Sequence, residues 1–196
     1  MRKAKITRET KETSITVSVV LDGEGKANIA TGVGFFDHML NHLAKHGLFD
    51  IEVDAKGDLE IDAHHTVEDV GICLGQAFLE AVGEPVGLTR FGHAVLPMDE
   101  ALAEVAVDFA GRPYFVYEAD LPKTAVGEFD AELAEEFLRA FAMNARLTLH
   151  VGLRYGTNVH HCIEVMFKTF AKALSRALTV DDRIKGVPST KGKLER

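Results

Sequence analysis

The sequence predicts an α+β fold with an internal duplication, in which a β-β-α-β-α half occurs twice. The first observation is that residues 64–82 and 160–178 align at an offset of 96, and that both begin with His-His. The second is that residues 36–53 and 134–151 align at an offset of 98. Apolar residues recur at helical spacing in these windows, and such halves should pack their helices against sheets.

The first half is predicted to span residues 1–87. Residues 14–21 (SITVSVVL) alternate apolar and polar side chains, as a half-buried strand does, before a turn at Gly23. Residues 36–53 are typical of a helix followed by a short strand, and residues 64–82 are typical of an amphipathic helix. The half therefore ends on a helix, before a glycine-containing junction.

The second half, residues 88–187, repeats this order. Residues 103–109 (AEVAVDF) match the strand of the first half at an offset of 88, which pairs Glu100 with Glu12. Residues 134–151 again predict a helix and a strand, and the second His-His window predicts the last helix. The offset of 98 also pairs His38 with Glu136. Each of these residues lies in the predicted helix that precedes a His-His window.

Composition limits the function. The 196 residues suit one ordinary domain or two small ones, and the 46% hydrophobic content is normal for a globular protein. A net charge of −8 argues against a nucleic-acid partner or an anionic membrane surface, although a local basic pocket could still bind a small anion. The chain has no signal-peptide pattern and only two cysteines, so we expect a reduced, cytoplasmic protein.

Each His-His window carries a Glu at the spacing of a metal site. On a helix, residues i and i+4 lie on one face about 5–6 Å apart. His64 with Glu68, and His160 with Glu164, are therefore each expected to bind one divalent metal. A single His-His pair is usually an ordinary surface feature, but two copies with the same Glu favour metal binding. Imidazole and carboxylate ligands without thiolate suit manganese, iron or zinc.

Further histidines are candidate ligands. Adjacent helix positions point in directions about 100° apart, so His65 and His161 should face a second metal. The duplication suggests a reciprocal arrangement, in which each metal takes a His–Glu pair from one half and a single histidine from the other. His38 is a further candidate ligand. His42 and His46 follow it at helical spacing; we predict a structural role for His42 and leave both roles open for His46.

Several basic residues are candidates for binding a phosphate group. Arg90, Arg112 and Lys168 occur singly, and each taken alone is typical of a surface cation. The tail, residues 188–196, is polar and contains glycine, so we expect a loop there. Its Ser-Thr-Lys-Gly run combines hydroxyls, backbone N–H groups and a cation. The tail is therefore predicted to bind phosphate.

Seven segments of the chain, taken in order, resemble the imidazoleglycerol-phosphate dehydratase family, and the resemblance runs from end to end. The segments are Arg8–Thr13 (RETKET), Gly34–Leu40 (GFFDHML), Asp62–Gly71 (DAHHTVEDVG), Arg90–Gly92 (RFG), Met98–Ala101 (MDEA), Gly156–Glu164 (GTNVHHCIE) with Phe167-Lys168, and Pro188–Gly192 (PSTKG). Seven motifs in one order make this match highly specific.

The resemblance implies a fold and a reaction. The fold would be a four-helix layer between two four-stranded mixed sheets. The chain would be a lyase of histidine biosynthesis that dehydrates D-erythro-imidazole-glycerol 3-phosphate to imidazole-acetol phosphate. Two manganese ions would serve each active site, and the partner would be the chain itself, in a 24-subunit homo-oligomer with sites at subunit interfaces.

The resemblance also implies roles for individual residues. The metal ligands would be His38, His64, His65, Glu68, His160, His161 and Glu164. The substrate contacts would be Glu12, Arg90, Arg112, Lys168, Ser189, Thr190 and Lys191. The catalytic carboxylates would be Glu12, Glu164 and Asp99.

One position departs from the family pattern. Many family members have a histidine ligand where this chain has Glu136. Because the internal repeat independently pairs Glu136 with His38, we predict that a carboxylate replaces the imidazole as a metal ligand. The alternative is an ordinary solvated helix residue.

The chemistry explains why metals are needed. The carbon-bound proton beside the imidazole ring is too weakly acidic for a carboxylate alone, and metals on both ring nitrogens would stabilise a di-manganese-bound imidazolate. We expect Glu12 to transfer one proton, and Glu164 or a metal-bound water to transfer the other. The basic residues would hold the phosphate and so orient the substrate.

Two other functions use part of the same pattern. A dinuclear metallohydrolase could use the same His/Glu set to activate water, but it would release inorganic phosphate from its substrate. A metal-storage or structural shell would have no use for a phosphate clamp. In that protein Arg112 and Lys191 could be replaced without functional loss.

Overall fold

The structure, a computed structural model, describes residues 1–194 of the chain. The first half consists of β1 (Lys3–Glu9), β2 (Thr13–Val20), β3 (Ala27–Ala30), α1 (Gly34–Gly47), β4 (Asp50–Gly57) and α2 (His64–Val82). The second half consists of β5 (Phe91–Met98), β6 (Ala101–Asp108), β7 (Tyr114–Glu118), β8 (Ala125–Val126), β9 (Phe129–Asp130), α3 (Leu133–Asn144), β10 (Thr148–Tyr155) and α4 (Val159–Ala177). The last two residues of the predicted tail, 195–196, lie outside the described residues.

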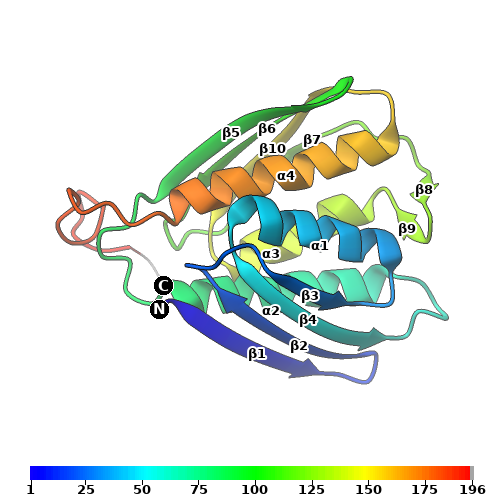
Figure 1. The fold of residues 1–196 in the computed structure, drawn as a ribbon, viewed down its shortest axis with the longest axis horizontal. Helices are drawn as coiled ribbons and strands as arrows, with labels where there is room; N and C mark the ends of the chain where they lie inside the picture. Colours follow the sequence, from blue (N-terminus) through cyan, green and yellow to red (C-terminus); the bar gives the residue numbers. More distant parts are fainter. Residues whose placement is uncertain (195–196) are drawn as a thin grey trace.

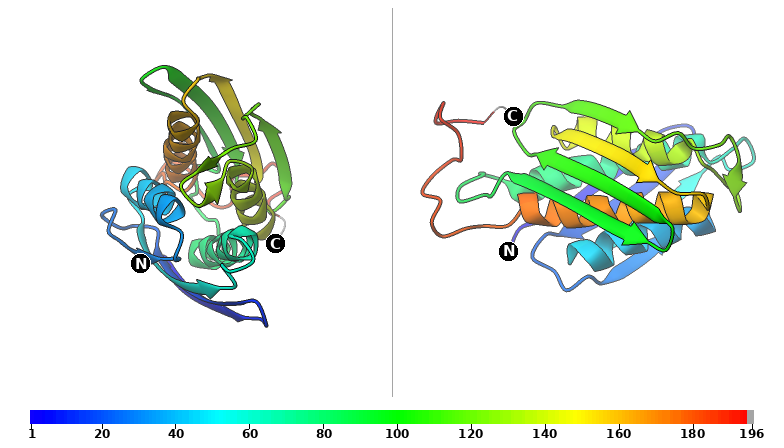
Figure 2. Two further views of the ribbon diagram at one scale, coloured as in Figure 1. Left: turned by 90° about the vertical axis from the view of Figure 1, so that its right-hand side faces the viewer. Right: turned by 90° about the horizontal axis from the view of Figure 1, so that it is seen from above.

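The helices form a layer between two four-stranded mixed sheets (Figures 1 and 2). The first sheet has the strand order β1-β2-β4-β3 and the second has β5-β6-β10-β7. In both sheets the last two strands are parallel and the other pairs are antiparallel. The identical order confirms the predicted α+β fold with an internal duplication.

Each of the two four-stranded sheets contains one strand more than the sequence pattern indicated. The strand β3 is four residues long, lies at the edge of its sheet, and has no fully buried residue. It therefore lacks the alternation that identifies a half-buried strand. Its counterpart β7 is also an edge strand. The β8–β9 hairpin adds a feature to the second half alone among the described residues.

One hydrophobic core joins the two halves. The strands β2 and β6 turn alternate residues inward, as the sequence predicts for half-buried strands. Between the sheets, the ring of Phe137 on α3 packs edge-on against Phe36 and is stacked on Phe167, with centroids 5.3 Å away in both cases. No helix within residues 1–194 is both long enough and apolar enough to cross a membrane.

Two glycines bring strand ends close to the helices that carry the His-His pairs. A Cβ on Gly57, at the end of β4, would overlap Oγ1 of Thr66. A Cβ on Gly156, just after β10, would lie 2.5 Å from Sγ of Cys162. Thr66 and Cys162 each follow a His-His pair directly and are buried. The first turns of α2 and α4 are therefore fixed against the sheets in the same way.

Candidate metal centres

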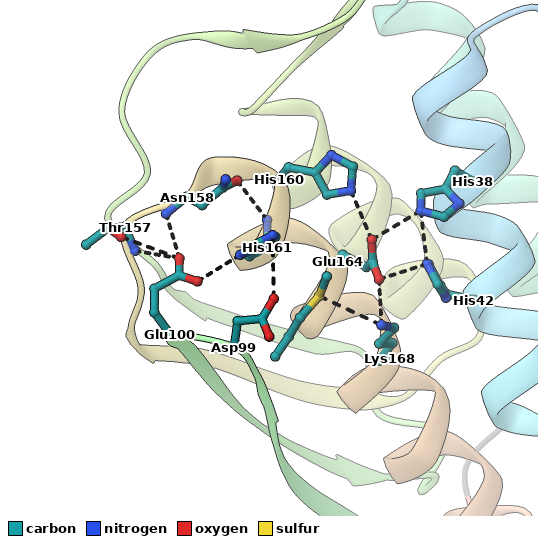
Figure 3. A network of polar contacts seen from close by, with 11 residues as sticks. His38, His42, Asp99, Glu100, Thr157, Asn158, His160, His161, Glu164 and Lys168 are labelled. Atoms are coloured by element: carbon teal, nitrogen blue, oxygen red, sulfur yellow. Dashed lines mark hydrogen bonds and ion pairs between the residues drawn. The ribbon is translucent and has the colours of Figure 1, made fainter.

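The helix α4 begins with one of the two His-His pairs. Its first turn is capped by Asn158, whose side-chain oxygen accepts a hydrogen bond from the backbone N–H of His161 at 3.2 Å. In the next turn, Glu164 is buried, with 5% of its surface exposed. Its Oε2 lies 3.0 Å from Nε2 of His160 and 3.1 Å from Nε2 of His38 on α1 (Figure 3). We call His38, His160 and Glu164 the Glu164 group.

The other carboxylate oxygen of Glu164 is also occupied. Nζ of Lys168 lies 2.5 Å from Oε1, and Nε2 of His42 lies 3.2 Å from it (Figure 3). Burial raises the pKa of Glu164, but Lys168, His42, His160 and His38 together lower it to about 2. Burial is the main influence on His42 and lowers its pKa to about 4. At neutral pH the group therefore presents a carboxylate beside neutral imidazole of His42.

A second group lies at the start of α2. His64, Glu68 and Glu136 each offer a ligand atom, and these atoms lie within 4.8 Å of one another, as they do in the Glu164 group. Nε2 of His64 is 3.9 Å from Oε2 of Glu68, and both side chains are more than a third exposed. Glu136, on α3, forms an ion pair with Arg139. We call His64, Glu68 and Glu136 the Glu68 group.

The repeat maps one group onto the other. The His–Glu pair of α2 corresponds to the pair of α4, and Glu136 corresponds to His38. Each group therefore combines a pair from one half with a single residue from the other. That is the reciprocal arrangement the sequence suggested, with His38 and Glu136, rather than His65 and His161, as the single residues within one chain.

The second histidine of each pair points to a different set of carboxylates. Nδ1 of His65 is 3.0 Å from Oδ2 of Asp58 and 3.9 Å from Oε2 of Glu12. The hydrogen bond to Asp58 is the main cause of the raised pKa of His65. Within residues 1–194, His65 belongs to no three-residue ligand group. Asp58 was not predicted as a site residue, because it lies in the loop before α2 and outside the repeated motifs.

His161 has an equivalent environment. Its Nδ1 is 2.7 Å from Oε2 of Glu100, and its Nε2 is 3.9 Å from Oδ2 of Asp99 (Figure 3). The hydrogen bond with His161, and then the one from the backbone N–H of Asn158, lower the pKa of Glu100 to about 2. Glu12 and Glu100, paired by the repeat, thus lie beside equivalent histidines. Such carboxylates orient metal-binding imidazoles by holding the second ring nitrogen.

Most of the predicted phosphate-binding residues line a cavity of about 220 Å³, at the end of the helix layer that is opposite the His-His pairs. Its polar lining consists of Arg90, Arg112, Ser189, Thr190, Lys191 and Lys193. Nε and Nη2 of Arg90 donate to the two carboxylate oxygens of Asp108 at 2.7 and 3.0 Å, and Nη1 donates to the carbonyl of Pro188 at 2.9 Å. Arg90 therefore ties the tail to the sheet. Lys168, also predicted to contact the phosphate, is not part of this lining.

The basic cavity and the two ligand groups lie at opposite ends of the helix layer. The backbone N–H of Arg90 donates to the carbonyl of Ala177, the last residue of α4. His160 lies 17 residues earlier on the same helix, which corresponds to about 25 Å. In Figure 1 the starts of α2 and α4 lie on the right and the tail on the left.

The donor sets fit a divalent metal. Both groups offer imidazole nitrogen and carboxylate oxygen, a combination that suits manganese, iron or zinc. Cys162, the cysteine nearest to the histidines in sequence, is buried against Gly156 instead. Glu164 is held ionised by its neighbours, which is the state that a ligand requires.

Known proteins resemble the chain over nearly its whole length. The family model for imidazoleglycerol-phosphate dehydratase matches residues 31–174. The dehydratases of Acetivibrio thermocellus and Geobacter sulfurreducens are 61% and 57% identical to this chain. Each match covers 98% of this chain and 99% of the relative. The crystal structure of the Staphylococcus aureus enzyme is 42% identical, with a TM-score of 0.83, over 91% of this chain and 99% of that one.

The structure of the Pyrococcus furiosus enzyme in complex with (S)-C348 is 38% identical, has a TM-score of 0.83, and covers 96% of this chain and 100% of its own. Similarity of this extent covers both halves, both ligand groups and the tail. The chain therefore belongs to the imidazoleglycerol-phosphate dehydratase family of hydro-lyases.

Proposed function

We propose that this chain dehydrates D-erythro-imidazole-glycerol 3-phosphate to imidazole-acetol phosphate, a step of L-histidine biosynthesis. The observation that carries the proposal is the pairing of two repeat-related His/Glu groups with a basic cavity that includes the tail. A substrate with an imidazole at one end and a phosphate at the other needs both features. The family relationship supports the same reaction.

We propose that two manganese ions serve each active site. The Glu164 group and the Glu68 group would hold them, and His65 and His161, oriented by Asp58 and Glu100, would complete the ligand set. Bound manganese would supply Lewis acidity toward the imidazole ring, which makes the neighbouring C–H more acidic.

Two exposed carboxylates are suited to proton transfer. The side chains of Glu12 and Asp99 are 58% and 76% exposed. Oε2 of Glu12 lies 3.9 Å from Nδ1 of His65, and Oδ2 of Asp99 lies 3.9 Å from Nε2 of His161. We assign them to the removal and return of protons, with Glu12 as the base. Glu164 is less suited to accept a proton, because its neighbours lower its pKa to about 2. Its role in this proposal is that of a metal ligand.

The distance between the two features supports a homo-oligomer. A substrate whose ring and phosphate are separated by a few bonds of about 1.5 Å spans roughly 8 Å, whereas His160 and Ala177 are about 25 Å apart along α4. The ligand groups and the basic cavity of one chain therefore cannot hold the same substrate molecule. Copies of the chain must share sites, as they would in a 24-subunit shell.

The location of the protein is part of the same proposal. Both cysteines are free, and neither takes part in a disulfide among the described residues. Free buried thiols are typical of a reducing compartment, and amino-acid biosynthesis supplies a reason for one. We propose a cytoplasmic enzyme.

The test compares metal-free and manganese-loaded protein on imidazole glycerol phosphate. Formation of the ketone product only in the loaded sample is the expected result. Release of inorganic phosphate would indicate a hydrolase instead. If a Lys191→Ala variant binds manganese and turns the substrate over at the wild-type rate, the tail does not hold the phosphate. If the wild-type protein binds manganese and has no turnover, the result supports a metal-storage function.

A further inference from the structure

The two ligand groups occupy equivalent positions but are chemically unequal. The Glu164 group offers two imidazoles and one carboxylate, whereas the Glu68 group offers one imidazole and two carboxylates. The difference in ligand type arises at one pair of repeat-related positions, His38 on α1 and Glu136 on α3. If His65 and His161 complete the ligand sets, they add one imidazole to each group and leave the difference unchanged.

The residues around the groups increase the difference. Lys168 and His42 contact Glu164, and their repeat-related positions beside the Glu68 group are Ile72 and Ala140. The Glu68 group therefore has apolar residues where the Glu164 group has a cation and an imidazole. Glu68 is also far more exposed than Glu164.

The charges of the groups differ as well. In the Glu164 group the single carboxylate is paired with the ammonium of Lys168, so the two charges cancel. In the Glu68 group two carboxylates face one guanidinium, that of Arg139, which pairs with Glu136. A net negative charge therefore remains at the Glu68 group. This charge attracts a divalent cation electrostatically, and the attraction requires no covalent character in the metal–ligand bond.

Ligand type then decides which metal each group prefers. Imidazole suits zinc, nickel and copper, whereas carboxylate oxygen suits manganese and magnesium. We propose that zinc displaces manganese first from the Glu164 group, and that the Glu68 group, with its second carboxylate, keeps manganese to a higher zinc concentration. This inference rests on the metal sites of the proposed function. It predicts that one chain can hold two different metals at the same time.

The experiment is a zinc titration of the manganese-loaded wild-type protein, followed by the electron paramagnetic resonance signal of released manganese. We expect release in two equal steps whose zinc midpoints differ by about tenfold or more. Anomalous diffraction at the zinc edge, from crystals at the first step, should locate zinc at His38, His160 and Glu164. Release in one step, or zinc first at Glu68, would overturn the inference.

Variants at one position provide the control. Glu136→His gives both groups the same ligand types, so the two release steps should move closer together. Glu135→Gln, at an exposed neighbour on α3 outside both groups, should leave them separate. A two-step wild-type curve that is unchanged by Glu136→His would also refute the inference.

Failure of the inference differs from failure of the proposed function. One-step metal release from an enzyme that still makes the ketone product would remove the inequality of the sites and leave the dehydratase. Two-step release from a protein without dehydratase activity would do the reverse. Absence of any bound manganese in wild-type protein would refute both.

Discussion

The packing of α2 against α3 depends on Gly71 in a way that a single methyl group can test. A Cβ at Gly71 would lie 2.9 Å from Cβ of Ala140 and 3.0 Å from the backbone oxygen of Phe137. Both atoms are fixed to the backbone of α3, so no side-chain rotation can relieve the contact. Gly71→Ala must therefore push α3 away at the turn that carries Glu136.

Two opposing energies set the size of the effect. Replacing a glycine inside a helix with alanine stabilises it by roughly 0.5–1 kcal/mol. Overpacking a filled interior costs about 1–3 kcal/mol. The net loss at Gly71 should be about 1–2 kcal/mol, because the methyl group meets backbone, and for a protein of this size that lowers Tm by about 2–8 °C.

Thermal unfolding of Gly71→Ala beside Gly34→Ala is the measurement. Gly34 is the first residue of α1 and has no atom within 4 Å of its added Cβ, so that variant should be as stable as wild type or more stable. Manganese titration should show weaker binding at the Glu68 group alone. Equal stability of the two variants, or unchanged metal binding in Gly71→Ala, would refute the idea that close packing positions Glu136.

Four further outcomes are expected. Truncation before Gly186 should abolish turnover while both metals stay bound, as a metal count on the shortened chain would show. Asp58→Asn and Glu100→Gln should each weaken metal binding by about 10–100-fold in calorimetry, because they release the second nitrogen of a histidine. Arg90→Lys loses the two-pronged pair with Asp108 and should raise KM about tenfold in steady-state kinetics, with kcat less affected. A chelator should lower Tm, since a metal at 100 times its Kd contributes about 2.7 kcal/mol of stability.

The sequence predicted those parts of the fold that depend on local periodicity and on the repeat. Helical spacing places the His-His pairs at the starts of α2 and α4, and the offset of 98 pairs Glu136 with His38. The structure then brings each beside the His–Glu pair of the other half. Metal binding by these groups stays a prediction. The short strand β3 had no such signal, because an exposed edge strand has no buried face.

Contacts between distant segments could not be predicted from local patterns. His42 was expected to be structural, yet it touches Glu164 because α1 packs along α4. Asp58 has no acidic counterpart in the second half, because the offset of 98 pairs it with Gly156. The repeat therefore did not predict its contact with His65. The contact of Lys168 with Glu164 could have been predicted, because the two residues are four positions apart on one helix.

The exchange of residues between the halves has an evolutionary consequence. Neither half holds a complete ligand group, because each contributes a pair to one group and a single residue to the other. A half-length ancestor could have built such groups only as a twofold-symmetric dimer, in which every substitution changes both sites at once. Fusion of two gene copies ends that constraint. Glu136 opposite His38 is a change that only a fused chain can carry in one site and not in its twin.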